Sequence, residues 1–225
     1  MRTDADQRWQ KIGWQGCGWQ NIGWLLPVLV LLIYLPSLAS PFQFDDYNVI
    51  VENPAVHSLA AWWRSMPGIR PLLKLSYALN WVTVPEPAAF RLVNIGLHAV
   101  NALLVWRLLC EFARLRTLPP GVPLMTAALF ALHPIQTEAV TYVCGRSVTL
   151  MACFYLGSLL AWMVAMRTGH LRWKLTAGVA FLCAFLSKET ALILPLAAWL
   201  ISAVLPPPAF KADLKPARRA WRGLL

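Results

Sequence analysis

Six strongly apolar runs alternate with polar segments along the chain, and this alternation predicts a bundle of membrane-spanning helices. The runs are residues 24–39, 91–110, 121–133, 148–166, 174–187 and 190–206. Because a helix needs about 20 mostly apolar residues to cross a bilayer, the short runs 121–133 and 174–187 must tilt or borrow polar residues at their ends. A single helix over the last two runs would be about 50 Å long, so the polar residues 187–190 are expected to form a tight hairpin.

The first polar segment, residues 40–90, is much longer than the others and has an apolar pattern of its own. Trp62, Trp63, Tyr77 and Trp81 lie in it among basic and apolar residues. The stretches 57–66 and 70–80 are therefore interpreted as short amphipathic helices in the membrane interface. The predicted fold class is an all-α integral membrane protein with about six transmembrane helices and a long first outer loop.

The two ends of the chain differ in character from this membrane domain, which is assigned to residues 24–206. Residues 1–23 form a Trp/Gly-rich cytoplasmic segment with a five-residue repeat that starts at Trp9. A step of five residues does not keep the Trp side chains on one helix face, so an interfacial aromatic anchor is the simplest interpretation. Residues 207–225 form a basic cytoplasmic tail that is expected to contact anionic lipid.

Composition and charge agree with a membrane protein. The 225 residues are 58% hydrophobic and 13% charged, against about 45–50% and 25% in soluble domains, and the mean hydropathy is +0.54. This excludes a soluble enzyme, a disordered regulator and a nucleic-acid-binding domain. Although the net charge is +10, few of the 20 Lys and Arg fall on the outer side, namely Arg64, Arg70, Lys74, Arg91, Arg146 and Lys188. The positive-inside rule then places both termini in the cytoplasm, and the short loops favour a bacterial inner membrane over the endoplasmic reticulum.

Side chains that can carry chemistry gather in the outer segments, in four clusters. These are Asp45-Asp46, His133 with Glu138, Gly145-Arg146-Ser147, and Ser187-Lys188-Glu189. Carboxylates and cations so close to spanning helices need a reason, because desolvating a charge is costly. Together the clusters suit a reaction between a lipid-borne phosphate donor and an acceptor outside the membrane.

Each cluster taken alone also has a plainer interpretation. Asp45 and Asp46 suit a general base or a metal site, and equally a turn with a capping Asp. His133 and Glu138 follow the end of an apolar run, where a histidine is often structural. Arg146 and Lys188 suit a phosphate at that depth, and equally snorkelling or a local ion pair.

Several segments resemble, in collinear order, the transmembrane O-mannosyltransferases that carry tetratricopeptide repeats. They are residues 44–54 (FDDYNVIVENP), 70–72 (RPL), 90–99 (FRLVNIGLHA), 133–140 (HPIQTEAV), 145–146 (GR) and 187–189 (SKE). The resemblance covers about residues 40–200. It implies the N-terminal membrane half of such an enzyme, with the GT-C glycosyltransferase fold and an outward or lumenal active site.

The resemblance also implies a reaction and its residues. A hexose, mannose first, passes from a polyprenyl phosphate to Ser or Thr hydroxyls of an acceptor protein. Asp45, with Asp46 second, is implied as the general base. Glu138 and His133 would orient the base or the acceptor. The leaving phosphate would be bound by Arg70, Arg146 and Lys188, with Glu189 beside them.

No cofactor or metal is predicted, because the related enzymes generally need none. Asp45, Asp46, Glu138 and Glu189 are nevertheless the oxygen ligands that a hard cation would use. The expected partners are membrane lipid, the polyprenyl-phosphate-linked sugar, an acceptor protein, and other membrane subunits that supply further helices or repeats.

Two features favour an alternative function. Val148 stands where the family usually has an acidic residue, and no helical repeat of about 34 residues is visible in the chain. The alternative is a non-catalytic accessory or scaffold subunit of a larger membrane complex, built on a truncated GT-C-like fold. A transporter or channel is disfavoured because the charged residues cluster at one face and not in mid-span.

Overall fold

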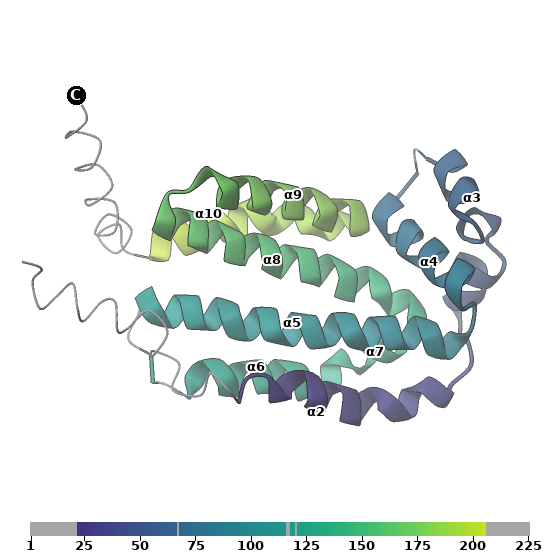
Figure 1. The fold of residues 1–225 in the computed structure, drawn as a ribbon, viewed down its shortest axis with the longest axis horizontal. Helices are drawn as coiled ribbons and strands as arrows, with labels where there is room; N and C mark the ends of the chain where they lie inside the picture. Colours follow the sequence, from purple (N-terminus) through teal and green to yellow (C-terminus); the bar gives the residue numbers. More distant parts are fainter. Residues whose placement is uncertain (1–21, 67, 116–117, 120, 206–225) are drawn as a thin grey trace, which may run out of the picture.

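The computed structural model describes residues 22–66, 68–115, 118–119 and 121–205, and these residues form helices and loops without a strand. Six of the described helices lie side by side along the long axis of the molecule (Figure 1). They are α2 (Leu25–Tyr34), α5 (Pro87–Leu115), α6 (Val122–Leu132), α8 (Arg146–Thr168), α9 (Leu171–Ser187) and α10 (Leu194–Val204). Each coincides with one of the six predicted runs. The predicted N-terminal segment, apart from residues 22–23, and the basic tail lie outside the described residues.

Two helical stretches are long and apolar enough to cross a bilayer, namely Pro87–Ala113 and Val143–Thr168. Three shorter apolar stretches, Leu25–Ala39, Val122–Leu132 and Glu189–Val204, fall below that length. The all-helical class is thus confirmed, whereas the number of six crossings stays a prediction.

The two helices expected in the long first loop are present, and they lie at one end of the bundle (Figure 1). They are α3 (Leu59–Arg64) and α4 (Pro71–Thr83). The Ser58 hydroxyl accepts a hydrogen bond from the Ala61 amide and so caps α3. The Trp62 indole donates to the Pro71 carbonyl at 2.9 Å and ties the two helices together. The end of the bundle that carries α3 and α4 is called the loop end below.

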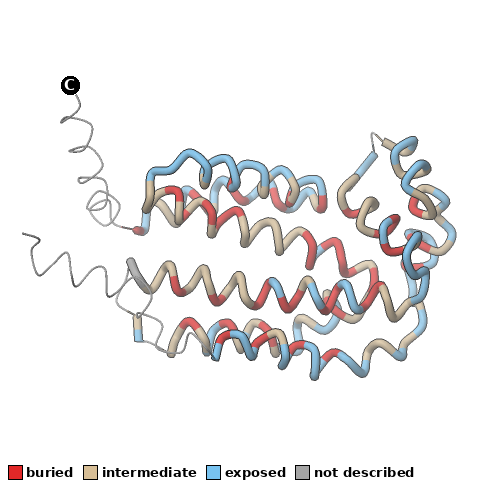
Figure 2. The backbone as a smooth tube through the Cα atoms, viewed as in Figure 1, coloured by how far each residue is buried: buried red, intermediate tan, exposed pale blue. Residues whose placement is uncertain are grey.

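The core is built around α5, which packs against α2 and α6 on one side and against α8 on the other. Figure 2 shows buried residues along α5 and along the beginning of α8, while α9 is largely exposed. Large apolar side chains such as Leu32, Val179 and Trp199 point outward on α2, α9 and α10. An apolar outer surface of this kind suits contact with lipid or with further helices.

A stripe of polar side chains runs along the buried face of α5. Arg91, Asn94, His98 and Asn101 follow steps of three and four residues, which keeps them on one helix face, and each is at most 1% exposed. Their donors bind the carbonyls of Thr141 (2.8 Å), Tyr142 (2.9 Å), Ala131 (3.0 Å) and Thr149 (2.9 Å), respectively. The stripe therefore fastens the end of α6, the segment that follows it and the start of α8 to α5.

The stripe is needed because that segment is not a continuous helix. Pro134 cannot donate a backbone hydrogen bond and ends α6. The Ile135 amide donates to the His133 ring at 3.2 Å and leaves the Ala131 carbonyl for His98. Buried carbonyls without a partner are costly, so Arg91 and His98 of α5 donate to the carbonyls of Thr141 and Ala131, where the helical donors are missing.

Candidate functional site

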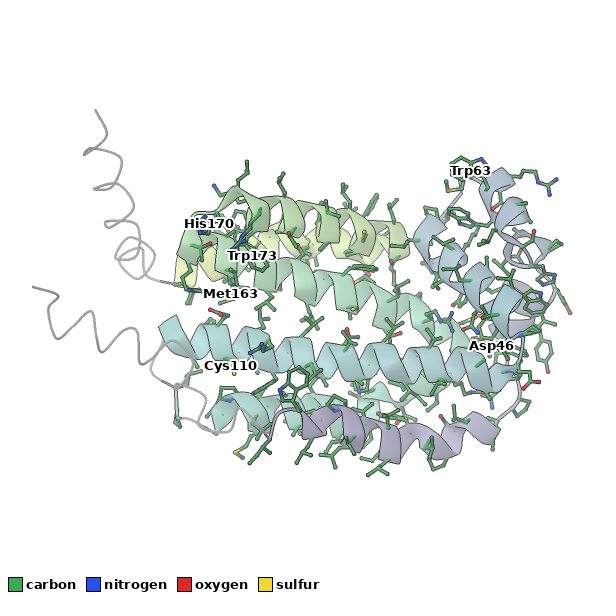
Figure 3. All side chains as sticks on the ribbon, viewed as in Figure 1. Asp46, Trp63, Cys110, Met163, His170 and Trp173 are labelled. Carbon is green, nitrogen blue, oxygen red and sulfur yellow. The ribbon has the colours of Figure 1, made fainter. Side chains whose placement is uncertain are left out.

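The predicted site residues come from segments that meet at the loop end of the bundle. The buried Arg91 guanidinium donates to the carbonyls of Ser40 and Pro41 as well as to that of Thr141, so it joins the first loop to α7 (Thr137–Thr141). Arg70 at the start of α4 binds Glu189, the first residue of the short 3₁₀-helix that precedes α10. Figure 3 shows Asp46 at this end, beside the beginning of α5.

The two adjacent aspartates have opposite environments. Asp46 is fully buried, and its carboxylate accepts hydrogen bonds from the backbone amides of Gln43 at 3.0 Å and Cys144 at 2.9 Å. Asp45 is exposed, and its carboxylate has no hydrogen-bond or ion-pair partner among the described residues. Its peptide N–H donates to the Tyr142 hydroxyl at 3.0 Å. Of the two, only the Asp45 carboxylate is open to a substrate.

Arg146 lies in the interior and is 0% exposed. Its guanidinium donates to the side-chain oxygens of Asn94 (2.9 Å) and Asn80 (2.8 Å). It also donates to the carbonyls of Ser76 (3.1 Å) and Phe90 (2.8 Å). Asn80 and Ser76 belong to α4, so this one side chain links the loop helix to α5 and α8.

Aromatic rings complete the surroundings of the Arg146 charge. The guanidinium lies 5.0 Å from the centroid of the Tyr77 ring and 5.1 Å from that of Phe90, within the range of cation–π attraction. No carboxylate of the described residues forms an ion pair with it. With its donors bound by protein oxygens, the buried Arg146 side chain holds the loop helix in place.

Arg70 and Glu189 form a bidentate ion pair between α4 and the turn after α9. The two guanidinium–carboxylate distances are 2.9 and 2.5 Å, and the side chains are 33% and 55% exposed. The backbone of Arg70 has φ 55°, the left-handed region that non-glycine residues rarely adopt. The hydrogen bond from Arg70 lowers the pKa of Glu189 to about 2. Beside the pair, the half-buried Lys188 has no hydrogen-bond or ion-pair partner in the described chain.

This pair is expected to respond to acid. Because the pKa of Glu189 is lowered from an ordinary 4.5 to about 2, its contribution to stability is complete above pH 4.5 and declines as the pH falls towards 2. Unfolding midpoints measured between pH 6 and pH 2 should therefore fall less steeply for Glu189→Gln than for the wild type. Glu52→Gln, the same change at an exposed glutamate outside the pair, should follow the wild type, and identical curves for all three proteins would contradict the assignment.

His133 and Glu138 are exposed on the segment between α6 and α8. The His133 ring accepts a hydrogen bond from the Ile135 amide at 3.2 Å and so begins the turn after α6. Within the described residues, no hydrogen bond or ion pair connects either side chain to Asp45. Nor do three or more His, Cys, Asp or Glu side chains of these residues gather in a group that could hold a metal ion.

Sequence reasoning missed three residues that build this site, namely Arg91, Asn94 and Tyr142. The sequence pattern could have indicated Arg91 and Asn94, because polar residues that recur at helical spacing inside an apolar run are typical of a buried polar face. It could not have indicated Tyr142, since the contact of Tyr142 with Asp45 joins positions 97 residues apart in the chain.

Gly145 precedes Arg146 and lies too close to the backbone for any side chain. A Cβ atom at this position would be 2.7 Å from the Ala139 carbonyl oxygen and 2.8 Å from that of Glu138. Gly145→Ala is therefore expected to lower the free energy of unfolding by about 2 kcal/mol, as overpacking does. Gly157→Ala is the matched control, because a Cβ there meets no atom within 4 Å. Denaturant or thermal unfolding measures both, and equal stability of the two variants would contradict the prediction.

Comparison with known proteins connects this arrangement to an enzyme family. Over 188 residues the chain is 35% identical to the protein O-mannosyl-transferase Tmtc2 of Drosophila melanogaster, and this alignment covers 73% of the chain and 20% of the relative. It is 31% identical over 188 residues to mouse TMTC1, covering 72% of the chain and 20% of the relative. It is also 31% identical over 154 residues to mouse TMTC3, in an alignment that covers 61% of the chain and 16% of the relative. The chain belongs to the TMTC-type O-mannosyltransferase family.

The predicted family is thereby confirmed, and with its two long apolar helices this TMTC-type chain has the character of a membrane protein. The chain spans about a fifth of the length of these curated relatives. No protein-family model matches it, and no solved structure does.

Proposed function

We propose that this chain takes part in the transfer of a mannosyl group from a polyprenyl phosphate to Ser or Thr hydroxyls of an acceptor protein, at the loop end of the bundle. The observation that carries the proposal is the exposed Asp45 carboxylate, which is held at the end of the molecule where Arg70 and Lys188 also lie. The relatives are named as protein O-mannosyl-transferases, which supports a mannosyl donor and a protein acceptor.

In this mechanism Asp45 is the general base. Its carboxylate takes the proton of the acceptor hydroxyl while the hydroxyl oxygen attacks the anomeric carbon from the side opposite the phosphate. The bond between the anomeric carbon and the phosphate oxygen breaks with inversion, and its electron pair goes to the lipid phosphate. Arg70 and Lys188 stabilise this charge. His133 and Glu138 are exposed and available to orient the acceptor.

Asp46 and Arg146 have positioning roles in this proposal. The Asp46 carboxylate is bound by two backbone amides and fixes the turn that presents Asp45. The Arg146 guanidinium is bound by α4 and α5 and fixes the helix that begins at Arg70. No metal is assigned to the reaction. A GT-C fold, which the family resemblance implies, stays part of the proposal. So do six crossings with both termini in the cytoplasm, which the charge pattern favours, and a bacterial inner membrane, which the loop lengths favour.

The experiment is a transfer assay with the purified 225-residue chain in lipid nanodiscs. Radiolabelled mannose is supplied on polyprenyl phosphate or on GDP, together with a Ser/Thr peptide or its Ala-substituted control. We expect label only in the Ser/Thr peptide and only from the lipid donor. Transfer from GDP-mannose would overturn the proposed donor, and absence of transfer by a folded chain would overturn catalysis by this chain alone.

A second function is an accessory subunit, and one observation favours it. Val148, at the position that is usually acidic, is exposed near the start of α8, so the loop end lacks one carboxylate of the family pattern. If the chain alone is inactive, copurification with other membrane proteins at fixed stoichiometry, with transfer only in that assembly, would support this function.

The ion pair of Arg70 with Glu189 makes a prediction about donor binding. The guanidinium fork that would hold the lipid phosphate is occupied by the Glu189 carboxylate, so the phosphate must displace it. Because an exposed ion pair is weak, Glu189→Gln is expected to tighten the Kd for a short-chain polyprenyl phosphate only by about two- to fivefold. Isothermal titration calorimetry measures this, with Glu52→Gln as the control for lost charge. Weaker binding by Glu189→Gln would mean that Glu189 holds Arg70 in its binding position instead.

A further inference from the structure

The turn that carries Asp45 is fastened to the segment before α8 at three points. The Arg91 guanidinium bridges the carbonyls of Ser40 and Pro41 to that of Thr141. The Asp46 carboxylate accepts a hydrogen bond from the Cys144 amide. Between these two buried contacts, the Tyr142 hydroxyl accepts a hydrogen bond from the peptide N–H of Asp45 at 3.0 Å.

The contact with Tyr142 differs from the other two in what it touches. Arg91 and Asp46 are 1% and 0% exposed and hold the turn as a whole, whereas Tyr142 contacts the candidate base itself. The Tyr142 ring also packs edge-on against Phe44, with centroids 6.4 Å apart and planes at 73°. Tyr142 is in turn anchored to α5, because its carbonyl accepts from the Asn94 amide at 2.9 Å.

The backbone at this point needs support. Phe44 has φ 46°, in the left-handed region, although it is neither glycine nor asparagine. Phe44 is 83% exposed, so burial of its side chain does not hold it there. A strained conformation persists only where the surroundings enforce it, and Tyr142 contacts both Phe44 and the N–H that follows it. Desolvation raises the pKa of Tyr142, so the hydroxyl remains a neutral acceptor in the physiological range.

We propose that Tyr142 is a positioning residue for Asp45: its hydroxyl and ring hold residues 44–45 in the conformation that presents the Asp45 carboxylate to the acceptor hydroxyl. This rests on the proposed role of Asp45 as the base. Tyr142 can affect the rate without touching substrate, because a displacement of about 1 Å of a reacting group lowers the rate by up to a hundredfold.

The test compares Tyr142→Phe with Tyr47→Phe. The first variant removes only the oxygen that accepts from Asp45. The second removes the same atom from an exposed tyrosine nearby, whose hydroxyl has no hydrogen-bond partner among the described residues. For Tyr142→Phe we expect kcat to fall about tenfold and KM to stay within about twofold, because the lost hydrogen bond lets the base move from its position. Tm should fall by at most about 4 °C, the effect of one hydrogen bond. Tyr47→Phe should match the wild type in all three.

A second measurement does not depend on activity. Amide hydrogen exchange at Asp45, followed in the full chain, should be about fivefold faster in Tyr142→Phe and unchanged in Tyr47→Phe. Unchanged exchange in Tyr142→Phe would overturn the proposed contact, and faster exchange with unchanged kcat would overturn its role in positioning. A rise in KM at constant kcat would mean that Tyr142 binds substrate and would also overturn the proposal. If the wild type transfers no mannose, the proposed function fails, while the exchange experiment still decides whether Tyr142 holds Asp45.

Discussion

Replacing Arg146 by methionine is expected to lower the free energy of unfolding by about 3 kcal/mol, since buried polar groups left without partners cost about 1–3 kcal/mol each. Methionine fills a similar volume but donates no hydrogen bonds. The side-chain oxygens of Asn80 and Asn94 would remain buried after losing their donor. The attraction of the guanidinium to the rings of Tyr77 and Phe90 would also be lost.

Thermal or denaturant unfolding in detergent measures this effect. Arg172→Met is the control, because Arg172 is exposed on α9 and lies over a single ring, that of Trp173; its cost should stay within about 0.5 kcal/mol, as for surface changes generally. Arg146→Lys should also destabilise, since one ammonium cannot reproduce the planar fork that reaches several acceptors. A wild-type stability for Arg146→Met would show that the guanidinium does not hold α4 as the structure indicates.

The second large effect separates the two neighbouring aspartates. Asp45→Asn is expected to lower mannosyl transfer at least about a hundredfold, the usual contribution of a general base. Tm should not change, because the exposed carboxylate has no hydrogen-bond or ion-pair partner in the described chain. Asp46→Asn is expected to lower the free energy of unfolding by about 2 kcal/mol, because the new NH₂ group cannot accept from both the Gln43 and Cys144 amides.

Transfer assays and unfolding midpoints measured on both variants test this separation. Transfer by Asp45→Asn at the wild-type rate would remove Asp45 as the base. Loss of transfer by Asp46→Asn at full stability would instead assign the chemistry to Asp46, through an opening of the turn that exposes it.

The sequence alone determined the helices and the order of the family segments. Apolar runs and amphipathic stretches are local patterns, and a chain that must satisfy its own backbone hydrogen bonds in an apolar setting forms helices wherever they occur. This is why α2, α5 and α8 appear where the hydrophobic pattern placed them, and why α3 and α4 appear inside the long loop. The collinear segments from Asp45 to Glu189 likewise identified the family without reference to any contact.

Only the tertiary structure decided what each of those polar residues does. Asp45 and Asp46 are equivalent as neighbours in sequence, and the fold separates them by turning one carboxylate onto the Cys144 amide and leaving the other exposed. From the sequence, Arg146 at the start of a helix is interpreted as a cation near the membrane surface. In the structure α4 covers it and supplies Asn80 as a hydrogen-bond acceptor. The burial and the hydrogen-bond partners of these residues depend on residues 50 to 100 positions away in the chain. A local pattern of apolar and polar residues does not indicate contacts over such distances.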